Sequence, residues 1–269
     1  VTADARAQVR RWRGPLILVI VVVLTSVVLA LAQGRSSRGY LDPDAVDPSG
    51  AGALAVLLEE QGVDVVRVTT AEAARDALYE AAGTKTLLVA AGLAPISDRM
   101  IDVVQEQRST HVVLVDADPI LLPAFAPWAN PSGGTASEDE VPPGCTWDVA
   151  QRVGPLSNLG FLYSTGQPTA STCWGGFVVD LPPRPGEEGV TLIGAGDGFT
   201  NAALADSGNA ALGLNVLGRD STVVWWLPSL ADPLQFEDGS EGASISDLVP
   251  SWVAIAVAQV FAAVLFTVW

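Results

Sequence analysis

The sequence predicts an α/β domain built on a parallel sheet and framed by two membrane-spanning segments. Short apolar runs alternate with helix-like segments over residues 63–115, which is typical of βαβ units. The alternation resumes after residue 176 and ends in the apolar run TVVWWL. A long uncharged apolar segment lies near each end of the chain, and each is long enough to cross a bilayer as a helix.

The predicted spans are residues 14–33 and 249–269. Four arginines but only one acid precede the first span, so the positive-inside rule places residues 1–13 in the cytoplasm. Residues 34–248 would then form an extracytoplasmic domain, and both ends of this two-pass cell-membrane protein would be cytoplasmic. A cleaved signal peptide is the competing interpretation of the first segment, because Ala30-Leu31-Ala32 follows a basic and an apolar region.

The exported part is strongly acidic. Without the four N-terminal arginines and Asp4, the chain has 14 − 4 = 10 basic residues and 30 − 1 = 29 acidic residues. Such a surface repels nucleic acid and anionic lipid, so we expect neither as a partner.

The elements of the domain follow from caps and apolar spacing. The first helix is predicted after the glycines of SGAGAL and ends at Gly62. Thr70 and Ser97 are typical N-cap residues that predict helices through residues 82 and 108. A last helix is predicted over 209–217, and strands over 63–68, 86–90, 111–115, 177–181, 190–193 and 222–227.

Residues 117–175 are predicted to form an irregular cap, because eight prolines exclude long helices. The only two cysteines, Cys145 and Cys173, favour a disulfide in an oxidising compartment, with two free thiols or a nucleophile as the alternative. The aromatic side chains Trp128, Trp147 and Trp174 indicate recognition of a partner or glycan, or else buried packing.

Polar residues that follow the predicted strands indicate a ligand site. Ligands of open parallel sheets bind beyond the carboxyl ends of the strands, so we expect these side chains to converge in one crevice. The residues are also typical of turns and helix caps, and three of them are aspartates that could hold magnesium or calcium. The candidate ligand-binding residues are Ser49, Asp116, Asp118, Asp197, Thr200 and Asn201.

The sequence predicts no catalytic residue, cofactor or metal. His111, the only histidine, begins its strand and lies at the edge opposite the acids. Neither cysteine lies in a nucleophile elbow, SGAGAL is not a dinucleotide fingerprint, and zinc ligands are too few.

Several segments together resemble a family of two-pass membrane proteins from actinobacteria. They are YLDP, SGAGALAVLLEEQGVDV, DADPILL, WDVAQRVG, STCWGG, GDGFTN, GNAALGLNVLG and VVWWLP. The resemblance implies a Rossmann-like exported domain similar in fold to class I glutamine amidotransferases. It also implies association with MoxR-type ATPases and their von Willebrand factor A-like partners.

The Cys, His and Glu of true amidotransferases have no matching positions here, so the resemblance does not imply that activity. We therefore expect a non-catalytic binding, scaffold or sensor subunit in the cell membrane. The alternative is a metal-assisted or acid–base hydrolase of cell-envelope material that uses the three aspartates.

Overall fold

The computed structural model describes residues 39–90, 96–117, 121–133, 140–157, 160–183, 185–229 and 232–235. The predicted cytoplasmic segment and both predicted spans lie outside these residues. Among the helices in the described ranges, none combines the length and the apolar character needed to cross a bilayer.

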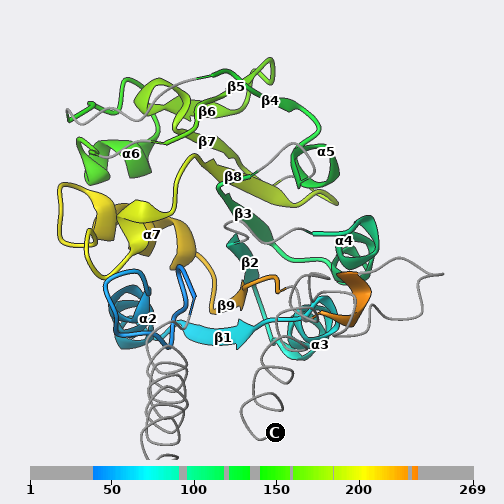
Figure 1. Cartoon of the computed structure of the whole chain (residues 1–269). Coiled ribbons are helices and arrows are strands. Elements are labelled where there is room, and N and C mark those ends of the chain that lie inside the picture. The colour runs from blue at the N-terminus through cyan, green and yellow to red at the C-terminus, as the bar shows by residue number, and fades with distance from the viewer. Residues whose placement is uncertain are drawn as a thin grey trace, which may run out of the picture.

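A seven-stranded sheet forms the centre of the described part of the chain, with helices on both faces (Figure 1). The strand order is β1-β9-β2-β3-β8-β7-β6. The strands are β1 (Asp64–Val68), β2 (Lys85–Ala90), β3 (His111–Val115), β6 (Ser171–Cys173), β7 (Val178–Leu181), β8 (Gly189–Ile193) and β9 (Thr222–Trp226).

The five strands from β1 to β8 in this order run parallel, which confirms the predicted α/β class with a mostly parallel sheet. β7 and β6 are antiparallel. Only seven residues separate β7 from β8. That connection is too short for the crossover that parallel neighbours need, so β7 must pair in the antiparallel sense.

The central strands are apolar on both sides because each face packs against helices. On one face, Val113 and Trp225 pack with α2 (Gly52–Glu60) and α7 (Asn209–Leu217). On the other, Val112 and Trp226 pack with α3 (Ala71–Glu80) and α4 (Asp98–Gln105). Neighbouring residues of a strand thus belong to opposite cores, as a side-chain period of two requires.

Both predicted helix caps are confirmed. The Oγ1 of Thr70 accepts a hydrogen bond from the Ala73 N–H at 3.2 Å, and the Oγ of Ser97 accepts one from the Met100 N–H at 3.3 Å. The two helices end before the predicted residues 82 and 108. α3 stops at Glu80 because the next residue is already extended and leads into a glycine turn.

The region predicted as an irregular cap contains short elements. They are α5 (Leu121–Phe125), β4 (Ala129–Pro131), α6 (Asp148–Val153) and β5 (Tyr163–Thr165), followed by β6. β4 pairs with β5 in a separate small sheet, whereas β6 pairs with β7 and so extends the central sheet. The predicted disulfide Cys145–Cys173 is present, with its Cα atoms 5.2 Å apart, and it ties the loop before α6 to β6.

Candidate functional site

Two aspartates meet at the carboxyl ends of β3 and β8, bridged by a tyrosine. Asp116 follows β3 directly, and Asp197 begins the short 3-10 helix η2 (Asp197–Phe199) after β8. The hydroxyl of Tyr40 lies 3.3 Å from Oδ2 of Asp116 and 3.1 Å from Oδ1 of Asp197. The Gly196 N–H also donates to Oδ2 of Asp116, at 3.2 Å. The structure thus brings together two of the predicted site residues and adds Tyr40, which sequence reasoning missed.

The environment of this trio raises the pKa values of Asp116 and Tyr40. Burial, and secondarily the negative charge of Asp197, raise the pKa of Asp116, while the hydrogen bonds from Gly196 and Tyr40 oppose the rise. Burial and the two carboxylates raise the pKa of Tyr40, so its hydroxyl stays protonated at neutral pH. The single hydroxyl proton of Tyr40 can be donated to only one carboxylate at a time. If Asp116 were protonated, it could donate to the Tyr40 oxygen while Tyr40 donates to Asp197.

The backbone around the trio is constrained. Asp116 has a φ of +55°, in the left-handed region that non-glycine residues rarely adopt. Its N–H donates to the Ile193 carbonyl at 3.0 Å, which fixes the turn to β8. A Cβ at Gly196 would lie 2.8 Å from the Tyr40 hydroxyl oxygen, so glycine is needed where the two segments meet. Strained backbone of this kind is concentrated at functional sites.

The other predicted residues make structural contacts close to the trio. The amide of Asn201 donates to the carbonyls of Ala45 and Asp47, at 2.8 and 2.7 Å, and its Oδ1 accepts from the Ala53 N–H at 2.8 Å. It therefore connects the segment after β8 to the first turn of α2. The buried Thr200 donates to the Asp197 carbonyl.

Ser49 is exposed and donates to Oδ1 of Asp47 at 2.9 Å. Asp118 lies outside the described residues. In the described ranges, no three His, Cys, Asp or Glu side chains are grouped as metal ligands.

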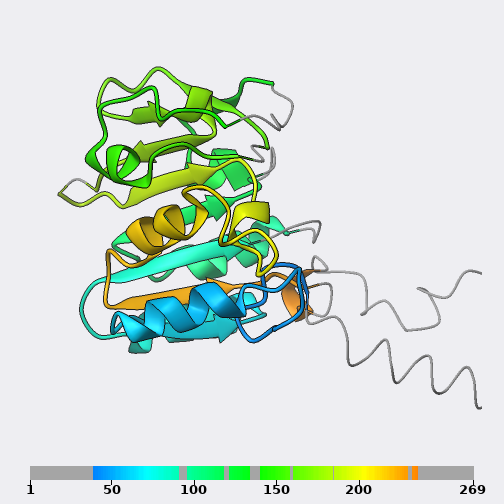
Figure 2. The same ribbon diagram turned by 90° about the vertical axis from the view of Figure 1, so that its left-hand side faces the viewer.

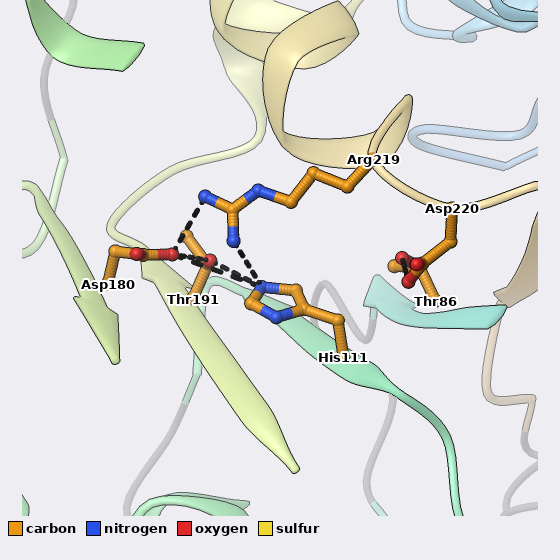
Figure 3. A network of polar contacts seen from close by, with 6 residues as sticks. All are labelled: Thr86, His111, Asp180, Thr191, Arg219 and Asp220. Atoms are coloured by element: carbon orange, nitrogen blue, oxygen red, sulfur yellow. Dashed lines mark hydrogen bonds and ion pairs between the residues drawn. The ribbon is translucent and has the colours of Figure 1, made fainter. Parts of the chain in front are cut away.

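A second polar cluster, drawn in Figure 3, lies toward the amino ends of β3 and β9, where His111 begins β3 and Arg219 precedes β9. Nε2 of His111 lies 2.7 Å from Oγ1 of Thr191, which donates to Oδ1 of Asp180 at 2.7 Å. Arg219 donates to the same Asp180 oxygen at 2.9 Å, and its other terminal nitrogen lies 3.3 Å from Nε2 of His111.

His111, Thr191 and Asp180 are buried, whereas Arg219 is exposed, and its positive charge compensates that of Asp180. Burial, reinforced by the positive charge of Arg219, lowers the pKa of His111 to about 3, so the imidazole is neutral at physiological pH. Next to it, Thr86 donates to a carboxylate oxygen of Asp220 at 2.8 Å (Figure 3). These partners were not predictable from the sequence, because Asp180 and Thr191 lie inside apolar strands.

The three tryptophans of the insertion differ in exposure. Trp174 is fully buried, and its Nε1–H donates to the Gly154 carbonyl at 2.9 Å, which fits packing. Trp147 is partly exposed and lies under the guanidinium of Arg219, 5.2 Å from ring centre to Cζ. Trp128 is also partly exposed.

Comparison with known proteins assigns the family. Residues 43–217 match the model of a domain of unknown function, DUF4350. This chain belongs to the DUF4350 family. The matched range runs from the loop before α2 to the last residue of α7. It therefore contains Asp116, Asp197 and the disulfide of this DUF4350 protein, but not Tyr40.

A relative supports the membrane assignment. An uncharacterized membrane protein of Mycobacterium tuberculosis is 30% identical over 265 residues, which are 96% of this chain and 66% of the relative. The DUF4350 chain therefore spans about two thirds of that protein's length. No solved structure matches this chain. The similarity to glutamine amidotransferases and the association with MoxR systems stay predictions.

Proposed function

We propose that this DUF4350 protein is a non-catalytic, membrane-anchored subunit whose extracytoplasmic domain binds a ligand or partner. In this proposal it serves as a scaffold or sensor in a membrane complex with a MoxR-type ATPase and a von Willebrand factor A-like protein. Kinship with a membrane protein supports the location. The partners rest on the resemblance of the quoted segments.

The observation that carries the non-catalytic interpretation is the separation of the groups that acyl-transfer chemistry needs. Both cysteines are joined in the disulfide, so neither is a thiolate nucleophile. The buried His111 lies at the amino-end edge, whereas Asp116 and Asp197 lie at the carboxyl-end edge. A general base must be within hydrogen-bond reach of the group it deprotonates, and here the sheet separates them.

The carboxyl-end trio is the binding feature of the proposal. In the described part of the chain, no basic side chain forms an ion pair with Asp116 or Asp197. Two carboxylates and a tyrosine hydroxyl without a cationic partner favour a ligand that brings hydrogen-bond donors or positive charge.

One observation favours the alternative, an acid–base or metal-assisted hydrolase of envelope material. Asp116 combines a strained backbone, a raised pKa and a second carboxylate bridged through Tyr40. Paired carboxylates whose environments differ are the usual arrangement for general acid and base roles. For a hydrolase we expect Asp116→Asn to abolish turnover of envelope material.

Crosslinking in native membranes tests the proposal. The full-length protein would be crosslinked in cells, purified in mild detergent and identified with its partners by mass spectrometry. Recovery of a MoxR-type ATPase or a von Willebrand factor A-like protein in near-stoichiometric amount would support the proposed complex. A solitary protein would contradict it and leave the hydrolase hypothesis, which Asp116→Asn then tests.

A further inference from the structure

Both ends of the described chain lie at the carboxyl-end edge of the sheet. At the beginning, Tyr40 contacts Asp116 and Asp197, which follow β3 and β8. At the end, the buried Asp232 accepts a hydrogen bond from the N–H of Ala71, the first residue of α3, at 2.7 Å.

A second hydrogen bond also places the C-terminal end of the described chain at the carboxyl-end edge. The Leu234 carbonyl accepts from the Oγ of Ser97, the N-cap of α4, at 2.7 Å. α3 follows β1 and α4 follows β2, so both helices begin at the carboxyl-end edge. In Figure 2 the blue start of the described chain and the orange η3 (Pro233–Gln235) both lie at this edge, although Figure 1 shows them well apart along it.

The connection to the first predicted span is short. The span ends at residue 33, so 40 − 33 = 7 residues lead to Tyr40. Fully extended, seven residues reach at most about 25 Å. The connection from residue 235 to the second predicted span at 249 has thirteen residues, 236–248, and reaches about 47 Å.

The opposite edge of the sheet is farther from both connections. A strand of five residues rises about 17 Å, and the loops at the amino ends extend beyond that. Turning the amino-end edge toward the bilayer would take most of the reach of the seven-residue connection. The geometry therefore favours one orientation of the domain.

From this we infer that the carboxyl-end edge of the sheet faces the outer headgroup layer of the membrane that carries the chain. Tyr40, Asp116 and Asp197 then lie within about 30 Å of the lipid, and the ligand of the trio is one presented at the membrane surface. The inference rests on the two-span topology of the proposed function, but not on the proposed partners.

The charge and exposure of this edge select the type of headgroup. The loop before α2 exposes Val46 almost completely, at 95%, between the carboxylates of Asp44 and Asp47. Asp44 is paired with Arg67 at 3.6 Å. The carboxylates of Asp47, Asp116 and Asp197 repel anionic lipid and suit the ammonium groups of a zwitterionic headgroup layer. Val46 is uncharged, so its contact with the headgroup layer would not change this preference.

The test measures which edge lies near lipid. Val46→Cys and Ala82→Cys place a fluorophore at opposite edges of the full chain, since Ala82 is exposed and precedes β2. Each labelled protein would be reconstituted in phosphatidylcholine nanodiscs in which a fraction of the headgroups carries a nitroxide quencher. The native disulfide protects Cys145 and Cys173 from the label.

We expect quenching of the Val46→Cys label to exceed that of the Ala82→Cys label several-fold. Ala202→Cys provides a second label at the carboxyl-end edge, because exposed Ala202 is hydrogen bonded to Pro48, and it should behave like Val46→Cys. Equal quenching at both edges, or stronger quenching at Ala82→Cys, would overturn the inference. Failure to recover the proposed partners would leave this result unchanged, so the two proposals fail independently.

Discussion

The buried imidazole of His111 should make the domain less stable in mild acid than at neutral pH. Its pKa is about 3 in the folded protein, against about 6.5 in an unfolded chain. Between these values the unfolded chain binds a proton that the folded protein does not, so the free energy of unfolding falls as the pH decreases from 6.5 toward 3. At about 1.4 kcal/mol per pKa unit, the loss is about 2 kcal/mol between pH 7 and pH 5.

The variant His111→Gln isolates this effect. Glutamine does not titrate, and its amide can still reach the Thr191 hydroxyl, whose oxygen lies 2.7 Å from Nε2 of His111 in the native protein. Urea unfolding of the detergent-solubilised chain, followed by tryptophan fluorescence, would be compared at pH 7 and pH 5. Between pH 7 and pH 5, we expect the free energy of unfolding of the wild type to fall by about 2 kcal/mol more than that of His111→Gln, because all other titratable groups are common to both proteins.

A control separates titration from packing. Thr191→Val removes the hydroxyl that contacts both His111 and Asp180 but leaves the imidazole in place. It should lower stability at both pH values and keep the wild-type pH dependence. An equal pH dependence in wild type and His111→Gln would refute the assignment of the acid sensitivity to His111.

The remaining predictions concern the carboxyl-end edge and the disulfide. Reduction of the disulfide, which closes a loop of 28 residues, should lower the free energy of unfolding by about 3–4 kcal/mol, measured by urea unfolding with and without reductant. Asn201→Ala breaks three hydrogen bonds to the backbone and should cost about 2–3 kcal/mol. Asn215→Ala should cost less than half of that in the same assay, because the Asn215 side chain bonds to Ala211 in its own helix and, in an exposed contact, to Arg152. Tyr40→Phe removes a donor that lowers the pKa of Asp116, so that pKa should rise further in a carboxyl-carbon NMR titration, and an unchanged or lower value would contradict the hydrogen bond. Calcium, magnesium or manganese should leave the melting temperature unchanged if the trio is not a metal site, whereas a shift abolished by Asp197→Ala would support the hydrolase alternative.

The fold was predictable where one residue type decides the local structure. Apolar runs flanked by polar residues located the parallel strands, because such strands are buried on both faces. The hydroxyls of Thr70 and Ser97 located two helix starts, because they satisfy free backbone N–H groups. The short strands β4, β5 and β6 have three residues each, which is too few to show a periodicity.

The candidate site was predictable only in part. The topology placed Asp116 and Asp197 at one edge, and the structure joins them there. Tyr40 was not predictable, since the chain must fold before a residue 76 positions away reaches Asp116. The structural role of Asn201 was not predictable either. An asparagine after a glycine turn is as typical of a ligand contact as of the backbone contacts that it makes here.

The two edges of the sheet differ in how their charges are compensated, and this difference supports the proposed binding role of the carboxyl-end edge. At the amino-end edge, Arg219 neutralises Asp180, and the pKa of His111 keeps the imidazole uncharged. At the carboxyl-end edge, burial raises the pKa of Asp116 while Asp197 remains exposed. A ligand with a positively charged or donor group would relieve the repulsion between these two carboxylates, and binding it would lower the pKa of Asp116. The pKa of Asp116, followed while candidate ligands are added, therefore tests the proposal that this edge of the domain binds a ligand.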